Sequence, residues 1–110
     1  MKIRLLSDLH LEMRKFAPLQ MVFKKKADVV ILAGDIGNPY TDDYKKLIEY
    51  CSSTHEKVIV VCGNHEYYNK RTMSKIDSKI RQLCADEDNI HFLQTDSVIH
   101  NKVKFIGCTL

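Results

Sequence analysis

The fold is decided by the stretch Val58-Ile59-Val60-Val61-Cys62-Gly63-Asn64-His65-Glu66. A continuous apolar run ends there in a glycine, an amide, an imidazole and a carboxylate. Four to eight β-branched residues without alternation are typical of a strand covered on both faces, so the run predicts a buried strand. In open α/β sheets, ligands bind just beyond the carboxyl ends of the strands. The polar residues at the end of this run are therefore a candidate site.

Two earlier apolar runs end in the same kind of polar turn. Residues 2–6 continue into Ser7-Asp8-Leu9-His10, and residues 28–33 continue into Gly34-Asp35. Each run predicts a buried strand because its apolar residues are nearly continuous. The carboxyl ends of parallel strands meet at one edge of a sheet, so we expect the three polar turns to lie together.

Two amphipathic helices and three further strands complete the predicted fold. Thr41 can cap the first helix, whose apolar stripe is Tyr44, Leu47, Ile48 and Cys51. The second helix has one apolar face, made of Met73, Ile76, Ile80, Leu83 and Cys84. The opening run corresponds to a strand at 57–62. The further strands are predicted at 90–93, 97–100 and 103–110, the last of them buried and preceded by a tight turn at Asn101-Lys102. This order predicts an α/β fold over residues 1–110, with a mixed, mainly parallel sheet and flanking helices.

Composition and charge exclude several classes of protein. With 110 residues, 45% of them hydrophobic and 28% charged, the chain is typical of one soluble globular domain and not of a disordered segment. The net charge of +3 favours the approach of an anionic substrate but is no nucleic-acid signature. Lys24-Lys25-Lys26 is interpreted as a solvated loop.

The sequence predicts a cytoplasmic protein without a membrane anchor. The first apolar stretch is interrupted by Ser7 and Asp8, unlike a signal peptide, and no apolar segment approaches the roughly 20 residues that span a bilayer. The four cysteines form no C-x-x-C pair, so we expect buried free thiols in a reducing compartment.

The residue types at the three turns are those of a divalent-metal site. The candidate ligands are Asp8, His10, Asp35 and Asn64. Carboxylate, imidazole and amide groups together suit a fairly hard cation. Asp35, in the central turn, is well placed to bridge two metals, which can clamp both oxygens of a phosphoryl displacement. Gly34 and Gly63 are expected to keep this edge free of bulk.

Each turn taken alone has a simpler interpretation. Asp8-x-His10 and Gly34-Asp35 are common at strand ends, and His65 could be a hydrogen-bonded loop histidine. The metal site is favoured because all three turns follow successive strands. The other histidines, His55, His91 and His100, are interpreted as structural or solvent-facing.

Together the three turns resemble the first three motifs of the calcineurin-like metallophosphoesterase superfamily. The motifs are Asp8-x-His10, Gly34-Asp35 and Gly63-Asn64-His65-Glu66, and the resemblance runs from Met1 to Leu110. It implies the N-terminal half of an αββα sandwich. It also implies hydrolysis of phosphomonoesters or phosphodiesters at a centre of two divalent metal ions, which could be manganese, iron or zinc.

The resemblance also implies a role for each residue. Asp8 and His10 would hold the first metal, Asp35 would bridge both metals, and Asn64 would hold the second. His65 would be catalytic: it would steady the phosphoryl group and protonate the leaving oxygen. The nucleophile would be a metal-bound hydroxide. Glu66 is interpreted as a structural partner behind the ligands.

Two features depart from the family pattern. Gly34-Asp35 continues as Ile36-Gly37-Asn38-Pro39 instead of Asp-Arg-Gly, which argues against a phosphoprotein phosphatase. The later motifs, a lone histidine and a Gly-His-x-His, do not occur in this sequence. The second metal then keeps only Asp35 and Asn64, so we expect an incomplete domain, either a fragment or a natural truncation, with an incomplete second site.

Two functions remain open. The first is a metal-dependent phosphoesterase acting on a phosphate ester, with nucleotides and nucleic acids among the candidate substrates. The alternative is a non-catalytic metal-binding or interaction remnant of the family that docks a partner or self-associates. A homodimer or a second chain could complete the sheet and the metal site.

Overall fold

Four parallel strands form the sheet that brings the strand ends together. The computed structural model describes residues 1–13, 23 and 25–109. The elements in chain order are β1 (Ile3–Leu6), β2 (Val29–Ala33), α1 (Asp42–Thr54), β3 (Lys57–Val61), a short 3-10 helix η1 (His65–Tyr67), α2 (Met73–Ala85), β4 (Ile90–Phe92), β5 (Asp96–His100) and β6 (Val103–Gly107). The larger sheet has the order β1-β2-β3-β4, and β5 and β6 form a separate antiparallel pair. This confirms the predicted α/β fold with a mainly parallel sheet.

The register of the sheet aligns the three polar turns. Leu6 of β1 lies opposite Leu32 of β2, which in turn lies opposite Val60 of β3. Because all three strands run in the same direction, their polar continuations leave the sheet at the same edge.

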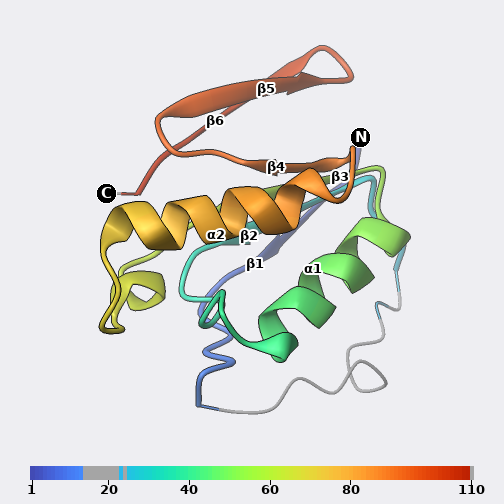
Figure 1. Cartoon of the computed structure of the whole chain (residues 1–110). Helices are drawn as coiled ribbons and strands as arrows, with labels where there is room; N and C mark the ends of the chain where they lie inside the picture. Colours follow the sequence, from blue (N-terminus) through green and yellow to red (C-terminus); the bar gives the residue numbers. More distant parts are fainter. Residues whose placement is uncertain (14–22, 24, 110) are drawn as a thin grey trace.

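The two faces of the sheet are covered by different elements, as Figure 1 shows. One face packs on α1 and α2 in a core of fully buried side chains that includes Val30, Leu32, Val58 and Val60. On the opposite face, Val29, Ile59 and Leu93 are buried against side chains of the β5–β6 hairpin. Coverage on both sides explains why the runs in β2 and β3 are continuously apolar.

Both helices begin as their capping residues dictate. The Thr41 side chain accepts a hydrogen bond from the Tyr44 N–H, 3.4 Å away, and Thr72 does the same for α2. All four residues of the predicted stripe in α1 are buried. In α2 the predicted face is buried except for Met73, which is 56% exposed. The prediction for Met73 was wrong because it is the first residue of the helix, outside the packed turns.

Two strands are less buried than their sequences predict. In β1, Leu5 is 66% exposed, so this edge strand is covered on one face only. In β6, Ile106 is 76% exposed, and the strand ends at Gly107. Cys108 and Thr109 follow outside any strand, and Leu110, the end of the predicted strand, lies outside the described residues. The hairpin turns a single face, with Val98 and Phe105, towards the sheet, so its other face is open.

Several smaller predictions can be compared directly with the structure. Asn101 and Lys102 have φ values of 48° and 64°, the left-handed pair that a tight two-residue hairpin requires. All four cysteines are free; three are buried, and Cys108 is exposed. Lys25 and Lys26 are exposed, as in a solvated loop, whereas Lys24 lies outside the described residues. Within the described part of the chain, no helix has the length and hydropathy of a membrane span.

Candidate metal centre

The turns after β1 and β2 are held together by backbone hydrogen bonds beyond the ends of the strands. The Asp8 N–H donates to Gly34 O at 3.0 Å, and the His10 N–H donates to Asp35 O at 3.0 Å. Asp8, His10 and Asp35 all have left-handed backbones, with φ values of 56°, 51° and 52°. Such conformations cost roughly 1–3 kcal/mol each for a non-glycine residue, and they concentrate at functional sites. These strained residues are three of the four predicted metal ligands.

The side chains of these three residues converge. One ligand atom from each of Asp8, His10 and Asp35 can be chosen so that all lie within 4.8 Å of one another. His10 Nε2 is 3.7 Å from Asp8 Oδ1, so this nitrogen faces the carboxylates. Two carboxylates and one imidazole are a suitable donor set for a divalent ion. The Asp8 side chain is 66% exposed, which leaves the cluster open to water and substrate.

Gly63 makes room for the Asp35 carboxylate. A Cβ atom at Gly63 would lie 2.3 Å from Asp35 Oδ1. The same oxygen accepts a hydrogen bond of 2.9 Å from the His65 N–H. A Cβ atom at Gly34, whose φ is 90°, would lie 2.6 Å from the Gly63 backbone nitrogen. Because Gly34 and Gly63 have no side chains, the turns after β2 and β3 can approach closely. Asp35 and His65 therefore lie side by side at the end of the sheet.

The buried Glu66 side chain connects the turns after β2 and β3. Its side chain is fully buried, and Oε1 accepts the N–H groups of Asp35 and Gly63, both at 2.7 Å. Burial raises the pKa of Glu66 above its ordinary value, although the same two N–H donors oppose the shift. The structure thus shows Glu66 as the structural partner that the sequence suggested.

Asn64 lies beside Asp35, and its side-chain amide can adopt two orientations that exchange its oxygen and nitrogen. In one, Nδ2 donates to the Tyr68 hydroxyl at 2.8 Å and the amide oxygen faces the Asp35 carboxylate. In the exchanged orientation, the amide nitrogen donates to the two Asp35 oxygens at 3.2 and 3.3 Å. The first orientation suits a cation between Asn64 and Asp35, and the second suits the site without one. The role of Asn64 as a ligand stays a prediction.

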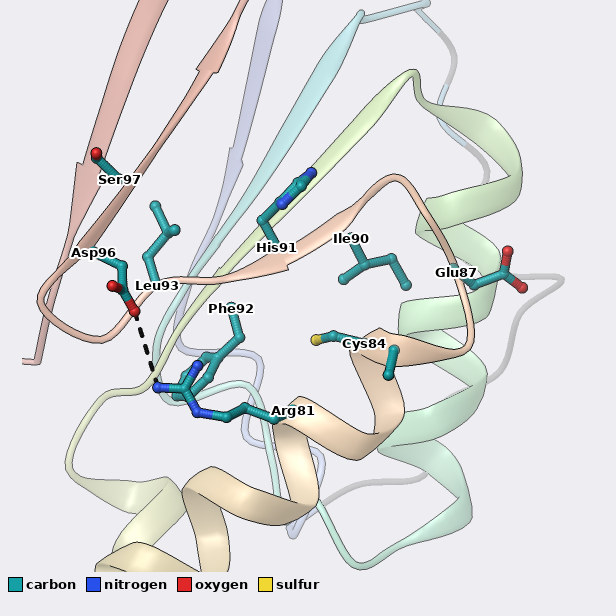
Figure 2. A pocket seen from close by; sticks show the side chains of 10 residues that line it. Arg81, Cys84, Glu87, Ile90, His91, Phe92, Leu93, Asp96 and Ser97 are labelled. Carbon is teal, nitrogen blue, oxygen red and sulfur yellow. Dashed lines mark ion pairs between the residues drawn. The ribbon is translucent and has the colours of Figure 1, made fainter.

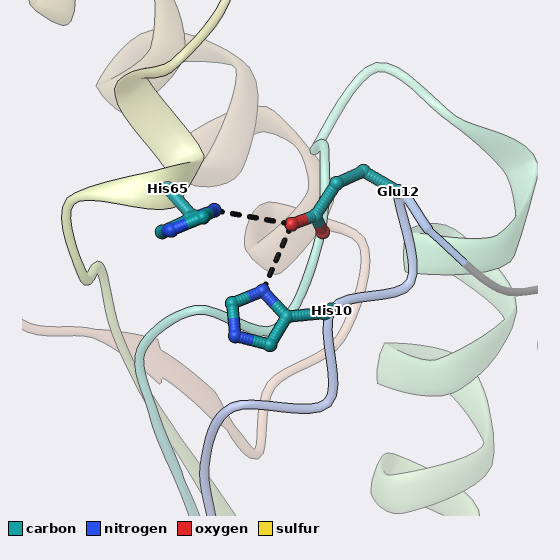
Figure 3. Close-up of side chains that lie close together, drawn as sticks. All are labelled: His10, Glu12 and His65. Carbon is teal, nitrogen blue, oxygen red and sulfur yellow. Dashed lines mark hydrogen bonds and ion pairs between the residues drawn. The ribbon is translucent and has the colours of Figure 1, made fainter.

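Sequence reasoning missed Glu12, which lies between the two histidines of the site (Figure 3). Its Oε1 is 2.9 Å from His10 Nδ1 and 3.3 Å from His65 Nδ1. The hydrogen bond to Glu12 is the main cause that raises the pKa of His10. Burial alone would raise the pKa of Glu12, but hydrogen bonds from His10 and from its own backbone N–H lower it overall. The available signal was a carboxylate two residues after a predicted ligand.

A surface pocket of about 490 Å³ lies elsewhere, between α2, β4 and β5 (Figure 2). Arg81 lines it, with its guanidinium carbon 5.0 Å from the centre of the Phe92 ring and a guanidinium nitrogen 3.9 Å from the Asp96 carboxylate. None of the predicted site residues lines this pocket. It is therefore separate from the chemistry at the strand ends.

The three remaining histidines make structural contacts, as predicted. His55 is buried, with its Nε2 2.8 Å from an Arg4 nitrogen, and burial lowers its pKa. His91 lies 3.0 Å from the Lys57 ammonium group, and burial is the main cause that lowers its pKa. His100 pairs with an exposed glutamate. None of them reaches the metal cluster.

Comparison with known proteins gives two matches. The sequence profile of the calcineurin-like phosphoesterase superfamily domain matches residues 1–105. An uncharacterized protein, L509, of Acanthamoeba polyphaga mimivirus is 32% identical over 121 aligned positions. The alignment covers 98% of this chain and 43% of the viral protein, so the chain spans less than half the length of that relative.

Proposed function

The chain belongs to the calcineurin-like phosphoesterase superfamily, whose members depend on divalent metal ions, and we propose that it hydrolyses a phosphomonoester or phosphodiester. The observation that carries this proposal is the convergence of Asp8, His10 and Asp35 within 4.8 Å at the open edge of the sheet. Strained backbones at all three positions support a functional origin for the cluster.

The donor set fits the metal ions of the family. Asp8, His10 and Asp35 would hold a first ion, and Asp35 with Asn64 would contact a second. A bound divalent cation polarises a phosphoryl oxygen and lowers the pKa of coordinated water towards neutrality. Manganese, iron and zinc all accept carboxylate and imidazole ligands, so the donor set favours no one of them.

The position of His65 beside this cluster supports a role in proton transfer. Its backbone N–H is bonded to Asp35 Oδ1, and its ring lies 4.6 Å from the His10 ring, centroid to centroid. Because Nδ1 faces Glu12, Nε2 is the nitrogen left for substrate. Imidazole can give a proton to a leaving oxygen near neutral pH, and we assign this role to His65.

Hydrolysis of bis-p-nitrophenyl phosphate and p-nitrophenyl phosphate tests the proposal. Purified chain with Mn²⁺ is expected to release p-nitrophenol, and Asp35→Asn is expected to lose turnover because it removes the central carboxylate. Asp88→Asn, at an exposed position before β4, is the matched control and should keep wild-type rates. Absence of turnover with Mn²⁺, Fe²⁺ and Zn²⁺ would refute catalysis by this chain.

A second candidate is a non-catalytic module that binds metal and docks a partner or a second copy of itself. The large exposed apolar side chains of Leu5, Ile99 and Ile106, each at least 66% exposed, favour this candidate. Calorimetry with Mn²⁺ and light scattering separate the two. Metal binding and self-association without turnover would favour the module, whereas turnover by a monomer would favour the enzyme.

A further inference from the structure

A single carboxylate oxygen is shared by the two imidazoles of the site. Glu12 Oε1 lies 2.9 Å from His10 Nδ1 and 3.3 Å from His65 Nδ1. Figure 3 shows the carboxylate directed between the two rings, which meet edge to face at 74°. Glu12 is not among the predicted metal ligands, and the match to the phosphoesterase family assigns it no role.

The shared contact bears on which nitrogen of each ring carries its proton. An ionised carboxylate can only accept hydrogen bonds, so His10 Nδ1, at 2.9 Å, is the donor in its hydrogen bond with Glu12. His65 Nδ1 lies within ion-pair distance of the same oxygen, at 3.3 Å, and would donate to it in the same way. A neutral imidazole has one N–H group, and Nε2 is therefore left with a lone pair. In His10 this Nε2 faces Asp8 at 3.7 Å, where a metal ligand is needed.

The backbone holds Glu12 in this position. The Leu11 N–H donates to Ile36 O at 2.8 Å, and the Met13 N–H closes a turn on His10 O at 2.9 Å. Glu12 is thus fixed between a turn and the exit of β2. Its side chain is 27% exposed.

We propose that Glu12 is a positioning residue that fixes the Nδ1–H tautomer and the orientation of both His10 and His65. In this role Glu12 acts through the two rings and is not itself a metal ligand, although Glu12, His10 and His65 also lie close enough together to hold an ion. A carboxylate behind a metal-bound histidine is a recurrent arrangement that orients the ring and raises its basicity. Here one carboxylate serves the ligand and the proton donor together. The inference rests on the proposed function for the roles of the two histidines.

Imidazole ¹⁵N chemical shifts of the metal-free protein measure the tautomers directly. Long-range ¹H–¹⁵N spectra, recorded at a pH where both rings are neutral, are expected to show Nδ1–H for His10 and His65. Glu12→Ala should move both rings towards Nε2–H. Glu12→Gln should largely keep Nδ1–H, because its amide oxygen still accepts. Glu49→Ala, at an exposed helix position that forms an ion pair with Lys45 at 3.9 Å, is the control. Wild-type rings in the Nε2–H form, or unchanged tautomers in a folded Glu12→Ala protein, would overturn the inference.

Titration with Mn²⁺ alone gives the second measurement. Loss of a residue behind a metal ligand typically costs 10–100-fold in affinity, so Glu12→Ala is expected to bind Mn²⁺ about 10–100-fold more weakly. Glu12→Gln should lose less, and Glu49→Ala nothing. Equal losses for the alanine and glutamine variants would overturn the inference, because the tautomer would then be irrelevant. If wild type shows the Nδ1–H tautomers but no ester hydrolysis, the proposed function fails while the positioning by Glu12 stands.

Discussion

Replacement of Glu66 by alanine should destabilise the protein, because it leaves two buried backbone N–H groups without an acceptor. The side chain is fully buried, and its Oε1 accepts two backbone N–H groups at 2.7 Å, from Asp35 and Gly63. A buried donor that loses its acceptor costs about 1–3 kcal/mol, so two donors cost about 2–6 kcal/mol. Removal of a costly buried carboxylate offsets part of this. We therefore expect Glu66→Ala to lower the free energy of unfolding by about 2–4 kcal/mol.

Glu66→Gln isolates the cause of that loss. Its amide oxygen can still accept both N–H groups, but its NH2 group takes the place of Oε2, which is buried without a hydrogen-bond partner. We therefore expect a smaller decrease than for alanine, about 1–2 kcal/mol. Urea unfolding followed by far-ultraviolet circular dichroism measures both variants against wild type. Glu49→Ala, which loses one exposed pair with Lys45, should stay within about 0.5 kcal/mol. A Glu66→Ala protein as stable as this control, or a glutamine variant as unstable as the alanine variant, would refute the reasoning.

Three further predictions follow from single positions. Gly63→Ala should abolish Mn²⁺ binding in titration calorimetry, because its Cβ would lie 2.3 Å from Asp35 Oδ1; wild-type affinity would contradict this. Burial lowers the pKa of His55, so the folded state binds fewer protons than the unfolded state. The His55 contribution to stability should therefore be full above pH 6.5 and be lost as the pH falls below it, with a shallower fall of stability in His55→Gln; equal slopes in urea unfolding would count against it. Lys102→Gly should raise the free energy of unfolding by about 0.5–1 kcal/mol because glycine adopts a φ of 64° without strain, and a lower melting temperature would rule this out.

The sheet and the meeting of its polar ends could be predicted from the sequence because both follow from strand direction. Once Asp8, Asp35 and His65 are assigned to the ends of successive parallel strands, the sheet itself brings them to one edge. The stretch from Val58 to Glu66 carries both signals: buried strand and polar exit. Side-chain contacts need not be known to predict the sheet and the edge at which its polar residues meet.

Glu12 could not be predicted because its position depends on the turn after His10. That turn begins with a left-handed residue and closes through the Met13 N–H, and sequence patterns do not specify such a path. A carboxylate at this position would otherwise be expected to face solvent. The connection that Glu66 makes between Asp35 and Gly63 depends in the same way on backbone geometry.

The errors at β1 and β6 have a common physical cause. A short apolar run indicates a strand but does not reveal whether a second layer covers its outer face. The β5–β6 hairpin packs over Val29 and Ile59 of the central strands, and Leu5 at the edge stays exposed. The outer face of the hairpin, with Ile106, is open for the same reason.

Anomalous diffraction from crystals soaked in Mn²⁺ tests the central claim most directly. The claim is that Asp8, His10 and Asp35 form a divalent-metal site at the carboxyl edge of the parallel sheet. We predict an anomalous difference peak within bonding distance of all three side chains in the wild-type protein, and its loss in Asp35→Asn. A map without density at this cluster at saturating Mn²⁺, or with manganese bound only at other residues, would contradict the account.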